Sequence, residues 1–270
     1  MKRRVPVSLG VGGAFLLALS LIALSVPWLP LTPPEMQEVA RQFESPSWSH
    51  PFGLGENGTD VLSQALWGAR LSLGVGFSSV VVSALIGLTL GSMAGYFGGR
   101  IDRAVSRLTD LLYAFPGLLL VVALAAVLGP SVRNMVIVLA TTSWAGYARL
   151  VRGVTLGLRE REYVQAARAV GATDVRILVR HVWPNLLAPL FVQMTFGLAS
   201  AILTESSLSF LGLGAPPGSP SWGQLLNTGR EVISSASHVV AFPGLMLVLT
   251  VLGLNLLGDG LRDRFDPKFR

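Results

Sequence analysis

The chain has 270 residues, of which 51% are hydrophobic and 13% are charged, and its mean hydropathy is +0.59. A soluble globular domain carries about 25% charged residues, so this composition excludes a large soluble domain and predicts one membrane-embedded domain over residues 1–270. The chain contains no cysteine, which excludes a disulfide framework, a thiol nucleophile and a cysteine-based metal site.

Six apolar segments approach the length of about 20 residues that a helix needs to cross the hydrocarbon core of a membrane. They are 8–29, 72–97, 108–128, 135–151, 190–213 and 239–257. The first follows Lys2, Arg3 and Arg4 and is too long for a typical cleaved signal peptide, so we interpret it as an uncleaved anchor. The fourth is the least apolar, because Arg149 and Arg152 lie near its end, where long side chains reach the interface. The sequence therefore predicts an all-α membrane protein with six transmembrane helices.

The basic residues lie almost entirely on one side of this arrangement. With both termini inside, and with Arg149 counted with the segment 152–189, the inner segments hold 17 of the 21 lysines and arginines, all except Arg41, Arg70, Arg133 and Arg230. By the positive-inside rule, both termini and the segment 152–189 are expected in the cytoplasm, and 30–71, here called the outer segment, outside. The same distribution argues against nucleic acid as a partner, although the net charge is +6.

Glycine recurs at every fourth position near the end of the second apolar segment, at Gly87, Gly91, Gly95 and Gly99. This spacing places the four residues on one helical face, where missing side chains let another helix approach closely. The neighbour is either a helix of the same bundle, which we favour, or a helix of another subunit.

Glu205 is a carboxylate well inside the fifth apolar segment. A charge at the centre of a bilayer costs about 2.5–3.5 kcal/mol on insertion scales, so this side chain is expected to face protein or a water-filled cavity. Two interpretations stay open: a group that lines a transport pathway, and a carboxyl group that is hydrogen-bonded to a neighbouring helix.

The segment 159–189 is a charged island between two apolar segments. In its first half apolar residues recur at spacings of three and four, as in an amphipathic helix; they are Tyr163, Val164, Ala167 and Val170. Ala166 and Ala167 together offer a small surface that a groove of a partner protein could accept closely.

Gly171 is suited to end this first helix in a left-handed conformation. Thr173 can then cap a second helix, which runs until Pro184 stops it or starts the next helix. Because its two ends are tied to spans, such a pair would transmit force better than a flexible loop. On physical grounds alone, a docking site for another protein and an interfacial pair that lies on lipid headgroups are equally supported.

The sequence lacks the residue patterns of an enzyme. It has no G-x-x-x-x-G-K-[ST] loop, so it does not hydrolyse nucleotides by that route. His50, His181 and His238 are far apart and show no metal-ligand spacing. We therefore expect a non-catalytic chain that binds neither a cofactor nor a metal.

Within the charged island, Gln165-Ala166-Ala167 is followed by Gly171 and then by Pro184 at the spacing of a known motif. The pattern resembles the cytoplasmic EAA motif of ABC-importer permeases, with Gln in place of the first Glu. Three further stretches resemble the second, C-type subunit of the dipeptide, oligopeptide and nickel permeases; they are 50–53 (HPFG), 205–214 (ESSLSFLGLG) and 257–263 (LGDGLRD).

The resemblance implies a type I ABC-importer permease in a bacterial or archaeal cytoplasmic membrane. It implies four protein partners: a second permease subunit, two cytoplasmic ATPases that bind ATP and magnesium, and an external solute-binding protein. The helix pair around Gly171 would carry the motion of the ATPases into the spans. Glu205 would belong to the framework of the family rather than to the substrate site.

The expected solute is a peptide or a related small solute such as a nickel chelate. The rival class is a self-sufficient secondary transporter driven by an ion gradient. It would need intramembrane ionisable residues or inverted repeats, and neither is convincing in this sequence.

Overall fold

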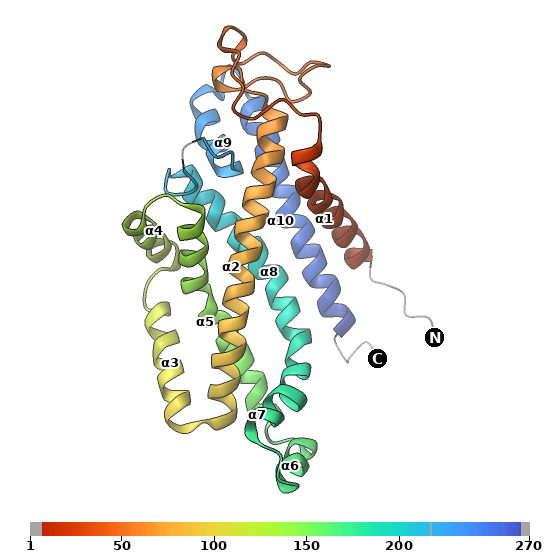
Figure 1. Cartoon of the computed structure of the whole chain (residues 1–270), viewed down its shortest axis with the longest axis vertical. Helices are drawn as coiled ribbons and strands as arrows, with labels where there is room; N and C mark the ends of the chain where they lie inside the picture. The colour runs from red at the N-terminus through yellow and green to blue at the C-terminus, as the bar shows by residue number, and fades with distance from the viewer. Residues whose placement is uncertain (1–6, 217, 266–270) are drawn as a thin grey trace.

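A computed structural model describes residues 7–216 and 218–265, and these residues form a bundle of helices (Figure 1). Their one extended pairing is an isolated bridge between Leu54 and Asp60, so the all-α prediction is confirmed. The basic residues Lys2, Arg3 and Arg4 and the segment 266–270, all expected inside, lie outside the described residues.

Apart from α4, which lies across the bundle, the long helices alternate in direction along it (Figure 1). They are α1 (Val7–Ser25), α2 (Val61–Phe97), α3 (Gly99–Tyr113), α4 (Gly117–Leu128), α5 (Val132–Leu158), α8 (Trp183–Phe210) and α10 (His238–Phe265). The short ones are α6 (Glu162–Ala169), α7 (Asp174–Ile177) and α9 (Trp222–Gly229). The outer segment lies at one end of the bundle, and α6 and α7 lie at the other.

The central helix is α2, which packs against α5, α8, α3 and α1. Its 37 residues span about 55 Å at 1.5 Å per residue, whereas a bilayer with its headgroup regions is about 40–45 Å thick. The helix begins at Val61, earlier than the expected start at 72, so its first turns belong to what we expected to be the outer segment. Asp60 caps it, because Oδ1 accepts a hydrogen bond from the Ser63 N–H at 2.9 Å while Oδ2 lies 2.7 Å from Nδ1 of His50.

The third expected span, 108–128, is not one helix. Instead, α3 and α4 meet at an angle of 87°. Pro116 lacks an N–H and disfavours helical backbone at the residue before it. The helix α3 therefore ends at Tyr113, and α4 starts at Gly117 in a new direction. The prediction of a continuous span was wrong at this point, because a run of apolar residues does not report the turn that a proline makes within it.

Four helical segments are each long and apolar enough to cross a membrane: α1, α2, α7 with α8, and α10. The bent pair of α3 and α4 makes a fifth if it counts as one span. The remaining expected span is α5, whose 27 residues reach about 40 Å, but Arg133, Arg149 and Arg152 make it less apolar. Length and composition of the described residues therefore support up to five spans, and the predicted count of six depends on α5.

Before α2 begins at Val61, the outer segment contains only short 3-10 turns, at Val39–Arg41 and Glu56–Gly58. Phe52 stacks on Phe242 of α10 with ring centroids 4.1 Å apart. Arg41 donates hydrogen bonds to Glu44, which lower the pKa of that exposed carboxyl group. The segment is thus held against the ends of α2 and α10.

Candidate functional site

The charged island folds into a helical hairpin, here called the hairpin, that consists of α6, a turn and α7. The turn is a Schellman motif: the Gly171 N–H donates to the carbonyl of Arg168 and the Ala172 N–H to that of Ala167, both at 3.0 Å. Gly171 has a φ of +83°, a left-handed conformation that costs other residues about 1–2 kcal/mol. Local sequence therefore dictates where α6 ends.

The second helix of the hairpin continues directly into α8. Thr173 caps α7, because its side chain accepts a hydrogen bond from the Arg176 N–H at 3.4 Å. A π-helical turn over Leu178–Val182 joins α7 to α8, and Pro184 lies in the first turn of α8. Proline is tolerated in the first turn of an α-helix, where its missing N–H breaks no α-helical hydrogen bond. Pro184 was expected either to stop the second helix or to start the next one, and the structure shows that it lies at the start of the next helix.

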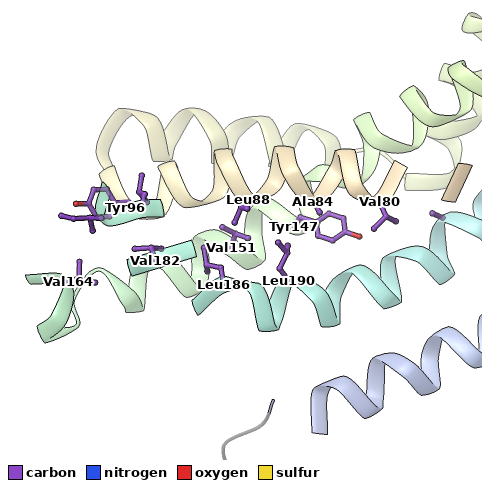
Figure 2. Close-up of a cluster of buried hydrophobic side chains, with 13 residues drawn as sticks. Val80, Ala84, Leu88, Tyr96, Tyr147, Val151, Val164, Val182, Leu186 and Leu190 are labelled. Carbon is purple, nitrogen blue, oxygen red and sulfur yellow. The ribbon is translucent and has the colours of Figure 1, made fainter. Parts of the chain in front are cut away.

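One side of the hairpin is buried against the long helices. Val164, Ile177 and Val182 are completely buried, and they join a core to which α2 and α5 contribute Tyr96, Tyr147 and other side chains. Figure 2 shows these side chains along the seam between α2 and α8, with Tyr96 and Val164 at its hairpin end. Burying side chains of this size contributes about 1.5–3 kcal/mol each, so the hairpin is fixed to the bundle.

Polar bonds add to this attachment at the end of α2. The Tyr96 hydroxyl donates to Oδ1 of Asp174 at 2.8 Å, and the Trp183 indole N–H donates to Oγ of Ser92 at 3.1 Å. Arg159 donates to the carbonyl of Gly95 at 3.2 Å. Sequence reasoning missed Tyr96 and Ser92, because they lie far from the hairpin along the chain and carry no local motif.

The opposite side of the hairpin is exposed, and it carries apolar side chains between charged ones such as Arg168 and Arg176. Val170 is 84% exposed and Val175 is 69% exposed, and Tyr163 and Ala166 also face outward. Clustered apolar side chains at the tip of a rigid element are typical of a protein-interaction surface. The residues expected to couple to a partner are therefore divided: Tyr163 and Ala166 are exposed, Ala167 is half-buried, and Gly171 and Thr173 shape the turn.

Gln165 has a structural role that explains the departure from the Glu of the motif. Its Nε2 donates to the carbonyl oxygen of Arg159 at 2.9 Å. An ionised glutamate has no hydrogen to donate and could not make this bond. In this chain the first position of the motif thus closes the connection between α5 and α6.

The glycines of α2 lie against α5. A Cβ on Gly91 would be 2.5 Å from the carbonyl oxygen of Ala148, and one on Gly95 would be 2.8 Å from that of Arg152; Gly87 lies against Tyr147. Gly99 is different, since it belongs to α3 and a Cβ there would have no neighbour within 4 Å. The expected packing role does not apply to Gly99, because α2 ends at Phe97.

Glu205 is completely buried between α8 and α2. Its carboxylate accepts hydrogen bonds from Ser72 at 2.6 Å, Ser209 at 2.8 Å and Ser206 at 3.3 Å. Solvent and solute do not reach it in this conformation, so the geometry disagrees with a pathway-lining group and fits the hydrogen-bonded alternative.

Among the described residues, no three His, Asp or Glu side chains come together as metal ligands.

Comparison with known proteins places this fold and hairpin in a family. Residues 87–270 match the family described as binding-protein-dependent transport system inner membrane component. The dipeptide transport system permease protein DppC of Alkalihalophilus pseudofirmus is 43% identical over 96% of this chain and 86% of its own length. The glutathione transport system permease protein GsiD of Pectobacterium atrosepticum is 44% identical over the same shares of the two chains.

A solved structure, described as the MetNI methionine ABC transporter in inward-facing conformations, shares the fold with a TM-score of 0.60. The match covers 74% of this chain and 95% of the solved chain, and the two sequences are 21% identical over it. The predicted membership of the ABC-importer permeases and the predicted type I permease fold are thus confirmed. The chain belongs to the binding-protein-dependent transport system inner membrane components, and it is a multi-pass permease subunit of an ATP-driven importer.

Proposed function

We propose that this permease subunit imports short peptides, together with a second permease subunit, two cytoplasmic ATPases and an external solute-binding protein. Relatives that are 43–44% identical are named for dipeptide and for glutathione, and both solutes are short peptides. The observation that carries the proposal is the hairpin, which exposes apolar side chains such as Val170 and Val175 on one side and is fixed to α2 and α8 on the other.

The hairpin passes the motion of the ATPases to the spans. When ATP closes the two ATPases, they move the exposed side around Val170 and Val175. Because α7 continues into α8 without a flexible loop, and because Tyr96 and Trp183 tie the same region to α2, both helices move with the hairpin. Alternate exposure of the pathway to the two sides of the membrane follows from this motion.

ATP and magnesium bind to the ATPases, and this chain binds no cofactor. The hairpin and both termini lie in the cytoplasm, as the distribution of lysine and arginine indicates. In this orientation the outer segment faces the solute-binding protein.

The proposal is tested by adding a charge to the exposed tip of the hairpin. Val175→Asp places a carboxylate on an apolar contact surface, where an unpaired charge opposes burial, and its exposed position leaves the fold intact. We expect the variant to purify without the ATPases and to lose ATP-dependent uptake of labelled dipeptide. The matched control for ATPase binding is Val39→Asp, because Val39 is 58% exposed on the outer segment, at the opposite end of the bundle from the hairpin.

Retention of the ATPases by Val175→Asp, with normal uptake, would contradict the role of the hairpin. Uptake by this chain alone, without any ATPase, would instead support an ion-coupled transporter. Failure of the wild-type importer to take up either dipeptide or glutathione would reject the proposed solute class but would not contradict the role of the hairpin in binding the ATPases.

A further inference from the structure

One exposed face of α8 is polar, although the helix is one of those apolar enough to cross a membrane. Gln193, Ser200, Thr204 and Ser207 recur at spacings of seven, four and three, which places them on the same side of a helix. Each of the four is exposed or half-buried. They are called the polar face below. Glu205 lies away from this face and is completely buried.

The exposed side of α10 provides an internal comparison. Its exposed positions between 241 and 257 are all apolar; they are Ala241, Leu245, Val248, Leu249 and Leu252. Such a surface is typical of a helix that faces lipid. Polar side chains within spans almost always face the bundle interior or a water-filled cavity, so the exposed sides of α8 and α10 face different surroundings.

The hydrogen bonds within the polar face differ from residue to residue. Thr204 and Ser207 each donate to a carbonyl of their own helix at 2.8 Å, so lipid would tolerate these two hydroxyl groups. The side-chain hydrogen bonds among the described residues include none from the Gln193 amide. An amide in hydrocarbon without a partner costs several kcal/mol, and Gln193 therefore indicates water at this face.

A cavity of about 480 Å³ lies beside Gln193. It is formed by α5, α8 and the end of α10, and its walls include Leu150, Phe196 and Arg262. Gln193 and Arg262 are the polar side chains that line it. The polar face therefore leads into an open space near the hairpin end of the bundle.

From these observations we propose that the polar face of α8 lines the solute pathway and that the cavity beside Gln193 is its cytoplasmic end. The inference rests on the proposed function, in which the solute is a short peptide. Hydroxyl and amide groups can both donate to peptide carbonyls and accept from peptide N–H groups. Such neutral groups bind the backbone shared by all peptides and release it easily, which suits a pathway better than a tight site.

The position of the polar face also links it to the ATPases. Asp174–Phe210 is one helical run that begins in the hairpin and carries the polar face in its second half. A rotation or tilt of the hairpin therefore turns the polar face toward one side of the membrane or the other.

The absence of cysteine from the chain allows a direct test in the assembled importer. Ser200→Cys and Thr204→Cys are placed on the polar face. Val248→Cys and Leu245→Cys are the controls on α10. They lie about as many residues from the outer end of α10, at His238, as Ser200 and Thr204 lie from the outer end of α8, at Phe210. The importer is reconstituted in proteoliposomes, with partner cysteines removed, and treated with a small hydrophilic thiol reagent with and without ATP.

A thiol reacts as the thiolate, which forms in water and is suppressed in apolar surroundings. We expect both α8 cysteines to react faster than their α10 controls, by on the order of tenfold or more in at least one nucleotide state. Excess dipeptide should slow the reaction at Ser200→Cys.

Equal, slow reaction at all four positions would show that α8 faces lipid and would overturn the inference. Cross-linking of Ser200→Cys to a single cysteine reintroduced into the second permease subunit, without reaction in either nucleotide state, would assign the face to a subunit interface and overturn the inference as well. Because the reagent reports water rather than peptide, failure of dipeptide uptake or protection would reject only the proposed solute. The assignment of a water-filled pathway would remain.

Discussion

At Gly91 the backbones of α2 and α5 come so close that no side chain fits between them. An added Cβ would lie 2.5 Å from the carbonyl oxygen of Ala148, and backbone atoms cannot move aside as a flexible side chain can. The spacing of the glycines was enough to predict a close neighbour for α2. It could not identify α5 as that neighbour, because the pairing of two helices depends on contacts distant in sequence.

Gly91→Ala should therefore force α2 and α5 apart. Overpacking of this kind costs about 1–3 kcal/mol, so thermal unfolding of the detergent-solubilised importer should begin at a lower temperature. Gly74→Ala is the matched control, because a Cβ there meets nothing within 4 Å and alanine favours a helix. Equal unfolding temperatures for the two variants would contradict the packing of α2 on α5.

Glu205 predicts a separation between stability and transport. Glu205→Gln keeps one oxygen, which can still accept hydrogen bonds from Ser72 and Ser206, and its NH2 group can donate to the Ser209 hydroxyl. Glu205→Leu leaves all three buried hydroxyl groups without their acceptor. The leucine variant should lose about 1–3 kcal/mol of stability, measured by thermal unfolding. The glutamine variant should fold and take up dipeptide normally. Lost uptake in a stable Glu205→Gln importer would instead support a pathway role for the carboxylate.

At the scale of elements, local signals predicted the hairpin well and the third span poorly. Gly171 and Thr173 have the backbone and capping roles that their residue types favour. The break near Pro116 was missed because the surrounding apolar residues dominated the interpretation. The hydrogen bonds of Tyr96 and Trp183 could not be predicted for a different reason, because nothing in a single sequence indicates contacts between residues so far apart.

Weakening these bonds should separate ATP hydrolysis from transport. Tyr96→Phe combined with Trp183→Phe removes two hydrogen bonds, each worth about 1 kcal/mol, and keeps aromatic rings in both places. We expect the ATPases to remain bound and to hydrolyse ATP while fewer peptides are imported per ATP. The control is Tyr113→Phe, because that tyrosine is exposed and lies at the end of α3, outside the hairpin. An unchanged ratio of peptide to ATP in the double variant would show that the attachment to α2 does not transmit motion.

At the scale of the whole molecule, composition and charge predicted the class of protein, and the family comparison agrees with it. The number of spans was harder to predict. Hydropathy treats α5 as a poor span because it carries three arginines, yet α5 packs along the central helix α2. Protein neighbours and the interface accommodate polar groups that lipid would not, and a scale based on lipid transfer ignores this.

The central claim is that the hairpin lies in the cytoplasm and binds the ATPases there, and a pair of single-cysteine variants tests it most directly. Val175→Cys on the hairpin and Val39→Cys on the outer segment are treated with a membrane-impermeant thiol reagent, in intact cells and in inverted membrane vesicles stripped of ATPases. We predict that Val175→Cys reacts only in inverted vesicles and is protected when the ATPases are added back, and that Val39→Cys reacts only in intact cells. Reaction of Val175→Cys in intact cells, or no protection by the ATPases, would contradict the account.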